Sequence, residues 1–330
     1  MKIQLVHSFE ELISIENILS AWQEFRKGKR DRIDVREFEF NLIDNIFDLH
    51  NSLYNHTYKH EGYQSFNVCD PKPRNIHKAT VRDRVLHRAV YRILYPFFDK
   101  IFISDSFSCR NHKGTHRAVN RFRTFSYQVS KNDTRTCWIL KCDIKKFFAS
   151  VNHKILLGIL HSYIPDKEII WVLKEIIETF YTVKPGIGLP LGNLTSQLFA
   201  NVYMNELDQF VKHELRVKYY IRYADDFIIL SDNKFWLEHA LNRIERFLSD
   251  KLNLSLHSGK IFIKTLNSGV DFLGYVSLPH CRILRTKTKK RMFKRLNQNN
   301  IPSYLGVLSH CNSYKLKNKL VRGILESHGQ

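Results

Sequence analysis

The spacing of apolar residues along the chain predicts several amphipathic helices. Apolar positions recur at helical spacing from Ser8 to about Arg26 and from about Val35 to Leu53, so we expect two helices whose apolar stripes face a core. A third helix is predicted from Thr80, with Pro96 ending it. The same pattern predicts helices at about 115–129, 152–162, 166–181 and 234–250, another ending near residue 212, and a very basic helical tail from 287 to 323.

Short β-prone runs lie between these predicted helices. Phe66–Cys69, Trp138–Asp143 and Val270–Tyr275 are each expected to form a strand. Tyr219–Tyr223 and Phe227–Leu230 flank a short turn and predict a β-hairpin. This mixture of helices and hairpins indicates the α+β class.

The turn of that hairpin carries two adjacent carboxylates, Asp225 and Asp226. Two ionised carboxylates repel each other, and burying them is costly unless a cation or hydrogen-bond donors neutralise them. Asp in a turn is ordinarily structural, because its side chain bonds nearby backbone amides. A third acid, Asp143, ends the predicted strand at 138–143, and such a set of carboxylates is typical of Mg²⁺ sites for phosphoryl transfer.

Charge and composition narrow the class of partner. Lys and Arg exceed Asp and Glu by 20, and the pI is about 9.7, which favours a polyanion such as nucleic acid over a membrane; a merely basic, soluble surface is the ordinary alternative. The 330 residues, 43% of them apolar, predict one catalytic body with a smaller appendage. The six cysteines include no Cys-x-x-Cys pair, so we expect reduced, structural thiols.

No membrane or secretion segment is predicted. The longest apolar runs fall short of the roughly 18–20 residues that a membrane-spanning helix needs. The start of the chain, Met1 to His7, has no long apolar segment and no small-residue cleavage site. We therefore expect a cytoplasmic protein.

Two further segments are candidates for binding phosphates or nucleotides. Residues 185–197 are dense in Gly and Pro, which permits close backbone approach to a ligand, although a surface loop is the ordinary alternative. In Pro71-Lys72-Pro73-Arg74 the prolines favour an extended backbone that carries two cations.

Taken in order, these motifs resemble those of a reverse transcriptase. The resembling segments are Asp143 with Phe147 and Phe148, Pro190 to Gln197, Tyr223-Ala224-Asp225-Asp226, Lys260, and Phe272-Leu273-Gly274-Tyr275. The resemblance implies a right-hand polymerase fold with fingers, an antiparallel-sheet palm and a short helical thumb. Its implied parts are an N-terminal helical segment at 1–60, fingers with the start of the palm at 61–135, the catalytic palm at 136–278, including helical finger-palm insertions, and a basic helical thumb at 279–330.

Two departures from the common pattern resemble the enzymes of diversity-generating retroelements. Leu191 stands where most reverse transcriptases have Gln, and Gln197 stands where they have Pro. Five other segments are also similar to that type: 71–74, 82–85, 113–119, 303–306 and 312–314. The resemblance implies error-prone copying of a template RNA into cDNA, with mistakes opposite adenine, and a small, basic accessory protein as partner.

The resemblance also assigns roles to individual residues. Asp143, Asp225 and Asp226, with the backbone carbonyl of Ile144, would hold two Mg²⁺ ions, and Lys260 would act beside the pyrophosphate. The nucleotide would be bound by Lys72, Arg74, Phe148, Leu191, Gly192 and Gln197, and the primer end by Phe272, Leu273, Gly274 and Tyr275. Alternation in an extended strand would bury one of Phe147 and Phe148 and leave Phe148 to exclude a ribose 2′-hydroxyl; the alternative is that both rings are core.

Other functions remain open at this point. A reverse transcriptase of a phage-defence or group II intron-like system would carry the same acids. A non-catalytic RNA-binding scaffold with a polymerase fold is a third possibility, which the intact set of aspartates disfavours.

Overall fold

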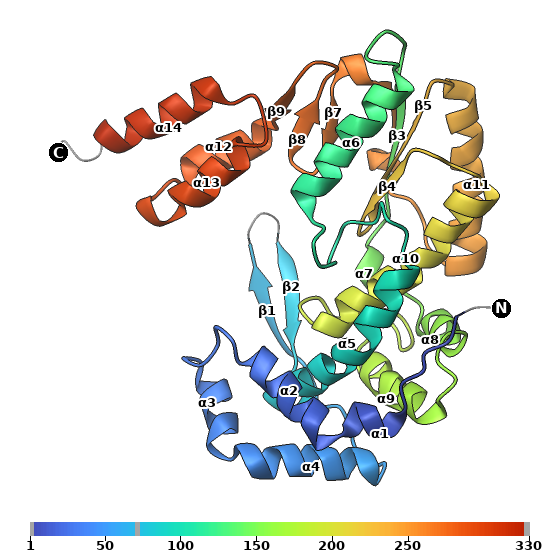
Figure 1. Ribbon diagram of the computed structural model, residues 1–330, viewed down its shortest axis with the longest axis vertical. Coiled ribbons are helices and arrows are strands. Elements are labelled where there is room, and N and C mark those ends of the chain that lie inside the picture. The colour runs from blue at the N-terminus through green and yellow to red at the C-terminus, as the bar shows by residue number, and fades with distance from the viewer. Residues whose placement is uncertain (1–2, 70–72, 327–330) are drawn as a thin grey trace. The chain divides into compact units, whose positions relative to one another are not determined.

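A computed structural model of the chain describes residues 3–69 and 73–326. The chain divides into two compact units (Figure 1). Unit 1 comprises 1–103, 144–210 and 245–255, and unit 2 comprises 104–143, 211–244 and 256–330. Each unit combines helices with antiparallel strands, so the predicted α+β class is confirmed.

The first two predicted helices are both present in unit 1, but each is broken once. The four resulting helices are α1 Phe9–Ile13, α2 Ile15–Phe25, α3 Ile33–Phe40 and α4 Leu42–Tyr54. Ser14 interrupts the first, because its hydroxyl accepts a hydrogen bond from the Asn17 amide (3.2 Å) and so caps a new helix. Asn41 interrupts the second with non-helical backbone angles (φ −109°, ψ 40°).

Pro96 does not end its helix, so that prediction was wrong. Helix α5 runs from Val81 to Ile101 with Pro96 inside it. A proline inside a helix costs about 3 kcal/mol. Leu94 before the proline and Phe98 after it are both almost completely buried, and this packing stabilises the helix on both sides of Pro96.

The rest of unit 1 is a hairpin and a group of helices. Strands β1 (Gln64–Val68) and β2 (Arg74–Lys78) pair antiparallel, as expected for a strand near Phe66. The helices are α7 Phe147–Ser150, α8 His153–His161, α9 Lys167–Glu178, α10 Leu194–Gln209 and the second half of α11 Lys234–Leu252. Phe147 and Phe148 therefore lie in a short helix, and the predicted strand alternation at these residues was wrong.

Unit 2 is built on a four-stranded antiparallel sheet. Its strand order is β4 (Tyr220–Tyr223), β5 (Asp226–Ser231), β3 (Trp138–Asp143) and β6 (Phe262–Thr265). The predicted hairpin and the predicted strand at 138–143 are both confirmed. Helix α6 (Thr115–Val129) packs on β4 and β5, and Phe122, Ile139 and Ile228 are fully buried in the shared core.

A second sheet and the basic tail complete unit 2. Strands β7 (Val270–Phe272), β8 (Tyr275–Ser277) and β9 (Arg282–Leu284) form an antiparallel sheet. The single strand predicted at 270–275 was wrong, because Leu273 and Gly274 have positive φ angles (50° and 90°) and form a turn. The tail is helical as predicted: α12 Thr286–Lys294, α13 Ile301–Leu308 and α14 Tyr314–Glu326.

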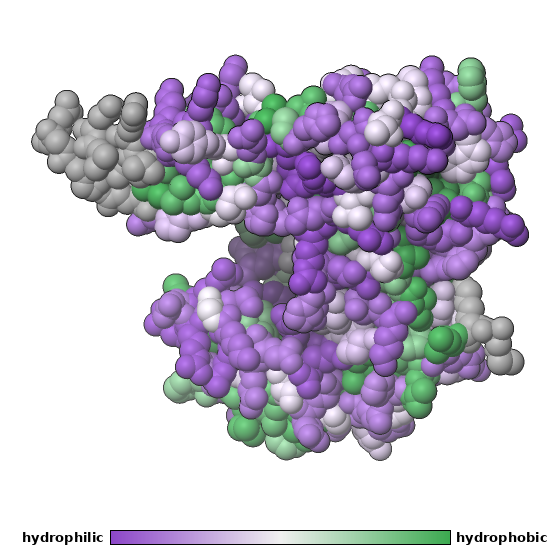
Figure 2. Space-filling model, turned by 45° about the horizontal axis from the view of Figure 1, so that its top comes forward, coloured by the Kyte–Doolittle hydropathy of each residue, from purple (hydrophilic) through white to green (hydrophobic). Residues whose placement is uncertain are grey.

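The visible surface is mainly hydrophilic, with apolar residues in small areas (Figure 2). Within the described ranges, no helix combines the length and apolar character that crossing a membrane requires. The six cysteines, all within the described residues, form no disulfide; Cys137 and Cys142 are buried, as structural thiols would be, whereas Cys69 and Cys109 are exposed.

Candidate active site

The fold of unit 2 brings the predicted acids together at one end of the four-stranded sheet. Asp143 is the last residue of β3 and Asp226 is the first residue of β5, and these two residues are directly paired in the antiparallel register. Directly opposed residues have Cβ atoms roughly 4.5–5.5 Å apart. Residues 143 and 226, which are far apart in the sequence, thus lie at the same end of the sheet because β3 and β5 are neighbours.

Asp225 lies in the turn that joins β4 to β5. The pair Tyr223 and Asp226 closes this hairpin, which leaves Ala224 and Asp225 as its turn residues. Ala224 has a left-handed backbone (φ 55°), a conformation that costs an L-residue on the order of 1 kcal/mol. The surrounding contacts must therefore hold the turn in place.

A lysine lies beside each of two acids, Asp143 and Asp226. Lys260 Nζ donates to Asp143 Oδ1 at 2.6 Å, and Lys141 Nζ lies 3.5 Å from Asp226 Oδ1. Lys141 was not predicted from the sequence, although strand alternation places it on the same face as Asp143, two residues later. The segment that carries Lys260 is tied to β3, since the amide of His257 donates to the carbonyl of Asp143 (2.8 Å).

Asp226 is the acid whose surroundings most require a further cation. Its Oδ1 is buried and has no hydrogen-bond partner. Burial raises the pKa of Asp226 to about 6; the positive charge of Lys141 opposes this rise, and the charges of Asp143 and Asp225 add to it. Carboxylate oxygens are the ligands that Mg²⁺ prefers, so the residues present fit a divalent cation. Within residues 3–69 and 73–326, however, no three His, Cys, Asp or Glu side chains form a preassembled metal site.

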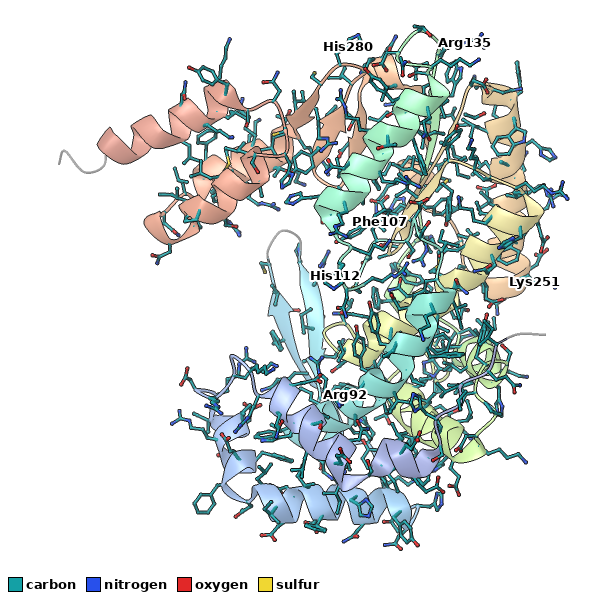
Figure 3. All side chains as sticks on the ribbon, in the orientation of Figure 1. Arg92, Phe107, His112, Arg135, Lys251 and His280 are labelled. Atoms are coloured by element: carbon teal, nitrogen blue, oxygen red, sulfur yellow. The ribbon has the colours of Figure 1, made fainter. Side chains whose placement is uncertain are left out.

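A buried arginine that the sequence reading missed supports the acidic turn. Arg222 is fully buried, and its Nη1 donates to the carbonyl of Ala224 at 3.1 Å. The backbone of Arg222 is also fixed, because its carbonyl accepts from the amide of Phe107 (2.9 Å; Phe107 is labelled in Figure 3). The sequence did contain a signal for this residue, since an arginine stands inside the otherwise apolar run Tyr219–Tyr223.

In unit 1 the Gly-rich segment lies against strand β2. The amide of His77 donates to the carbonyl of Leu191 (2.9 Å), and Asn193 Nδ2 donates to the carbonyl of His77 (2.9 Å). Gly192 has φ 110°, and a Cβ placed on it would lie 2.6 Å from Cγ2 of Ile76. Glycine is therefore required at residue 192 for both its backbone angle and its close contact.

The same segment borders a cationic cavity of about 250 Å³ in unit 1. Its walls include Gly192, Asn193 and Phe66, together with five basic side chains: Lys29, Arg32, Lys78, Arg84 and Arg88. Asp34 pairs with Lys78 and with Arg84, and Glu24 pairs with Arg88. The remaining positive charge suits phosphate groups.

The other predicted nucleotide contacts also fall in unit 1. Phe148 is half-buried while Phe147 is buried, so the predicted difference between the two rings is present although its cause is the helix α7. Gln197 is half-buried on α10, and Arg74 is exposed at the start of β2. Lys72 lies outside the described residues.

The remaining predicted residues are placed as follows. Ile144 directly follows Asp143 and its side chain is buried. The predicted primer grip, 272–275, forms the β7–β8 turn: Phe272 is fully buried, and the hydroxyl of Tyr275 donates to the carbonyl of Val307 on α13 (3.0 Å).

Comparisons with known proteins agree with this geometry. Residues 67–277 match the family described as "Reverse transcriptase (RNA-dependent DNA polymerase)". Protein YkfC of Escherichia coli (strain K12) is 25% identical over 249 residues, which cover 63% of this chain and 62% of YkfC. The group II intron-encoded protein LtrA of Lactococcus lactis subsp. cremoris is 23% identical over 290 residues, which cover 68% of this chain and 47% of LtrA. The chain thus spans less than two thirds of the length of these relatives.

Solved structures show the same fold. Telomerase from Candida albicans, in complex with the TWJ fragment of telomeric RNA, aligns with a TM-score of 0.54 and 11% identity over 75% of this chain and 52% of that chain. Telomerase from Candida tropicalis aligns with a TM-score of 0.52 and 13% identity over 67% of this chain and 48% of that chain. The predicted right-hand polymerase fold is confirmed by this likeness.

Because the family match covers more than half of the chain and includes both the strand of Asp143 and the hairpin of Asp225 and Asp226, the chain belongs to the reverse transcriptase family.

Proposed function

We propose that this chain is an RNA-directed DNA polymerase that copies a template RNA into cDNA for a diversity-generating retroelement. The observation that carries the polymerase assignment is the direct pairing of Asp143 with Asp226, with Asp225 in the adjoining turn. Oδ1 of Asp226 is buried, has no hydrogen-bond partner and lies 3.5 Å from Lys141 Nζ, which supports a cation-dependent reaction at this end of the sheet. Membership of the reverse transcriptase family supports the same reaction class.

In this proposal Asp143, Asp225 and Asp226 hold two Mg²⁺ ions, and the carbonyl of Ile144 supplies a further oxygen. When bound, such ions supply positive charge that lowers the pKa of the primer 3′-hydroxyl and stabilises the leaving pyrophosphate. The pairing of Asp143 with Asp226 in the sheet register supports this assignment. We assign to Lys260 the role of proton donor to the pyrophosphate; its side chain is 43% exposed.

We assign selection of the incoming nucleotide to residues of unit 1. Phe148 would exclude a ribose 2′-hydroxyl, which makes deoxynucleotides the substrate. Triphosphate binding is assigned to Lys72 and Arg74, and base-pair contacts to Leu191, Gly192 and Gln197. We assign binding of the primer end to the turn at 272–275 in unit 2.

The retroelement subtype rests on Leu191 and Gln197. An aliphatic side chain can neither donate nor accept a hydrogen bond, so Leu191 would discriminate poorly between right and wrong base pairs. Its backbone carbonyl is held by His77 whatever the side chain is. A template RNA, a DNA primer, deoxynucleotides and a small basic accessory protein are the partners of this proposal.

A primer-extension assay tests the polymerase assignment. Purified protein would receive an RNA template, a DNA primer, deoxynucleotides and Mg²⁺, with the accessory protein and cognate RNA in a parallel reaction. We expect extension by the wild type and by Asp250→Ala, an exposed aspartate on α11, and a loss of at least about 1,000-fold in Asp225→Ala. Extension that survives in Asp225→Ala would contradict the proposal.

The similarity to LtrA favours an intron-like enzyme as the second candidate. Such an enzyme would extend the same primer but copy adenines as accurately as other bases. Sequencing the cDNA separates the two, because the retroelement assignment requires errors concentrated opposite adenine.

A further inference from the structure

A second cationic cavity, of about 470 Å³, lies in unit 2 at the end of the sheet where β4 begins and β5 ends. Its walls come from the end of α6, from residues 216–219 and from residues 230–236. Asp226 begins β5, and Leu230, in the cavity wall, lies about 14 Å further along the strand at 3.4 Å per residue. The cavity is therefore separate from the carboxylates, and its size is within the range of ligand sites.

More cationic than acidic side chains line this cavity among the described residues. Lys131, Arg216 and Lys218 line it, and none of them has a carboxylate within ion-pair distance among the described residues. Asp232 is acidic and also lies in the part of the wall that the structure describes. Arg135 is a further cation at this end of unit 2 (Figure 3). An anionic ligand would relieve the repulsion between these groups.

Two aromatic rings lie among these cations. Tyr219 and Trp236 are half-buried, so part of each ring is open to the cavity. Tyr219 is held by an edge-on contact with Phe125 (ring centroids 5.3 Å apart), and Lys218 lies over its ring at 5.3 Å. The backbone of Trp236 is fixed by a hydrogen bond from its amide to Oδ1 of Asn233 (3.0 Å).

We propose that this cavity binds single-stranded RNA, with the three cations contacting phosphates and the two rings contacting bases. Cations that follow the backbone and aromatic faces that stack on bases are the combination that single-stranded nucleic acids require. An acidic peptide would use the cations but not the rings, and a basic protein would be repelled. RNA bound here leaves the carboxylate end of the sheet open, so the site would anchor RNA outside the segment being copied.

The first test measures binding of a fluorescein-labelled 12-nucleotide oligouridine to the full chain already saturated with a primer–template duplex. Arg216→Ala/Lys218→Ala is expected to weaken binding at least tenfold. It should also reduce the slope of log affinity against log salt by about 1.4, because each lost phosphate contact on a single strand removes about 0.7. The matched control, Lys154→Ala/Lys184→Ala, removes two exposed lysines of unit 1 and should leave affinity and slope unchanged.

The second test locates the probe. Oligouridine that contains 4-thiouridine is expected to crosslink to peptides carrying Tyr219 or Trp236, and Lys131→Ala should reduce that crosslink severalfold. Equal losses in the two double variants, or crosslinks found only elsewhere, would overturn the proposal. Tighter binding of a labelled decaglutamate than of oligouridine, lost in Arg216→Ala/Lys218→Ala, would assign the cavity to an acidic protein segment instead.

The binding and crosslinking outcomes do not require that the protein extends a primer. Arg216→Ala/Lys218→Ala should unfold at the wild-type temperature and extend a short primer–template at the wild-type rate. If the wild type fails to extend any primer but binds oligouridine at this cavity, the RNA site stands and the polymerase proposal fails.

Discussion

At the scale of residues, the site depends on charged side chains that the fold buries beside one another. Asp226 has an oxygen without a hydrogen-bond partner, and Lys141 is the cation nearest to it. Arg222 is completely buried and bonds the turn that presents Asp225. The sequence motif predicted the acids. It did not predict Lys141 and Arg222, because the roles of these two residues depend on the register of β3 and the burial of β4.

Arg222→Met tests the support of the acidic turn. The methionine keeps much of the buried volume but cannot donate to the carbonyl of Ala224, so we expect the free energy of unfolding to fall by about 1.5–3 kcal/mol and primer extension to slow at least tenfold. Urea unfolding and single-turnover extension are the measurements. Arg246→Met, at an exposed position of α11, should match the wild type in both; a wild-type extension rate in Arg222→Met would show that the turn does not need this bond.

Leu191→Gln tests the assigned cause of low fidelity. A glutamine side chain can hydrogen-bond near the incoming nucleotide, so errors opposite adenine should fall by roughly tenfold, which corresponds to about 1.4 kcal/mol of added discrimination. Leu191→Met keeps an apolar side chain and should copy adenine as inaccurately as the wild type. Sequencing cDNA made from one RNA template measures all three proteins, and an unchanged error rate in Leu191→Gln would contradict the assignment.

At the scale of elements, hydrogen bonds at His77 join the segment 191–193 to strand β2 of unit 1. Gly192→Ala would force an alanine to φ 110° and place its Cβ 2.6 Å from Ile76. We expect the free energy of unfolding to fall by about 1–3 kcal/mol and the KM for deoxynucleotides to rise. Gly62→Ala, where an added Cβ meets nothing within 4 Å, should change stability by less than about 0.5 kcal/mol; equal stability of the two variants would argue against a tight Gly192 contact.

The elements that the sequence predicted correctly are those with a strong local signal. The hairpin β4–β5 and the strand β3 follow from apolar runs that end at acids, and Ser8 caps α1 with a capping box. The errors have two causes. Burial of Leu94 and Phe98 stabilises α5 on both sides of Pro96, and the left-handed backbone of Lys146 redirects the chain into α7 at Phe147. The pairing of Asp143 with Asp226 needed the fold, because sequence spacing does not say which strands are neighbours.

At the scale of the whole molecule, two buried histidines couple stability to pH. Nε2 of His60 lies 3.1 Å from Nε2 of His87 in unit 1, and burial lowers the pKa of both imidazoles, that of His87 well below its usual value. In the unfolded chain both histidines take up a proton near pH 6.5. The folded state binds fewer protons, so stability is fully present above about pH 6.5 and is lost as the pH falls below it.

His87→Leu tests this coupling. Between pH 6.5 and 5.5 an imidazole that stays neutral in the folded state, with an unfolded pKa near 6.5, contributes an average slope of about 1 kcal/mol per pH unit, so the slope of unfolding free energy against pH should be smaller in His87→Leu by about that amount. His239→Leu removes an exposed histidine and should keep the wild-type slope. Urea unfolding across this pH range makes the comparison, and equal slopes in all three proteins would refute a buried neutral His87.

The polymerase function proposed for this chain depends on divalent ions bound by Asp143, Asp225 and Asp226. Titration of Mn²⁺ by electron paramagnetic resonance, on the protein bound to a primer–template and a deoxynucleotide, tests this without requiring turnover. We predict that Asp143→Asn and Asp226→Asn bind fewer Mn²⁺ ions, or bind them at least tenfold more weakly, than the wild type and Asp250→Asn. Identical Mn²⁺ binding by all four proteins would contradict the proposed metal site.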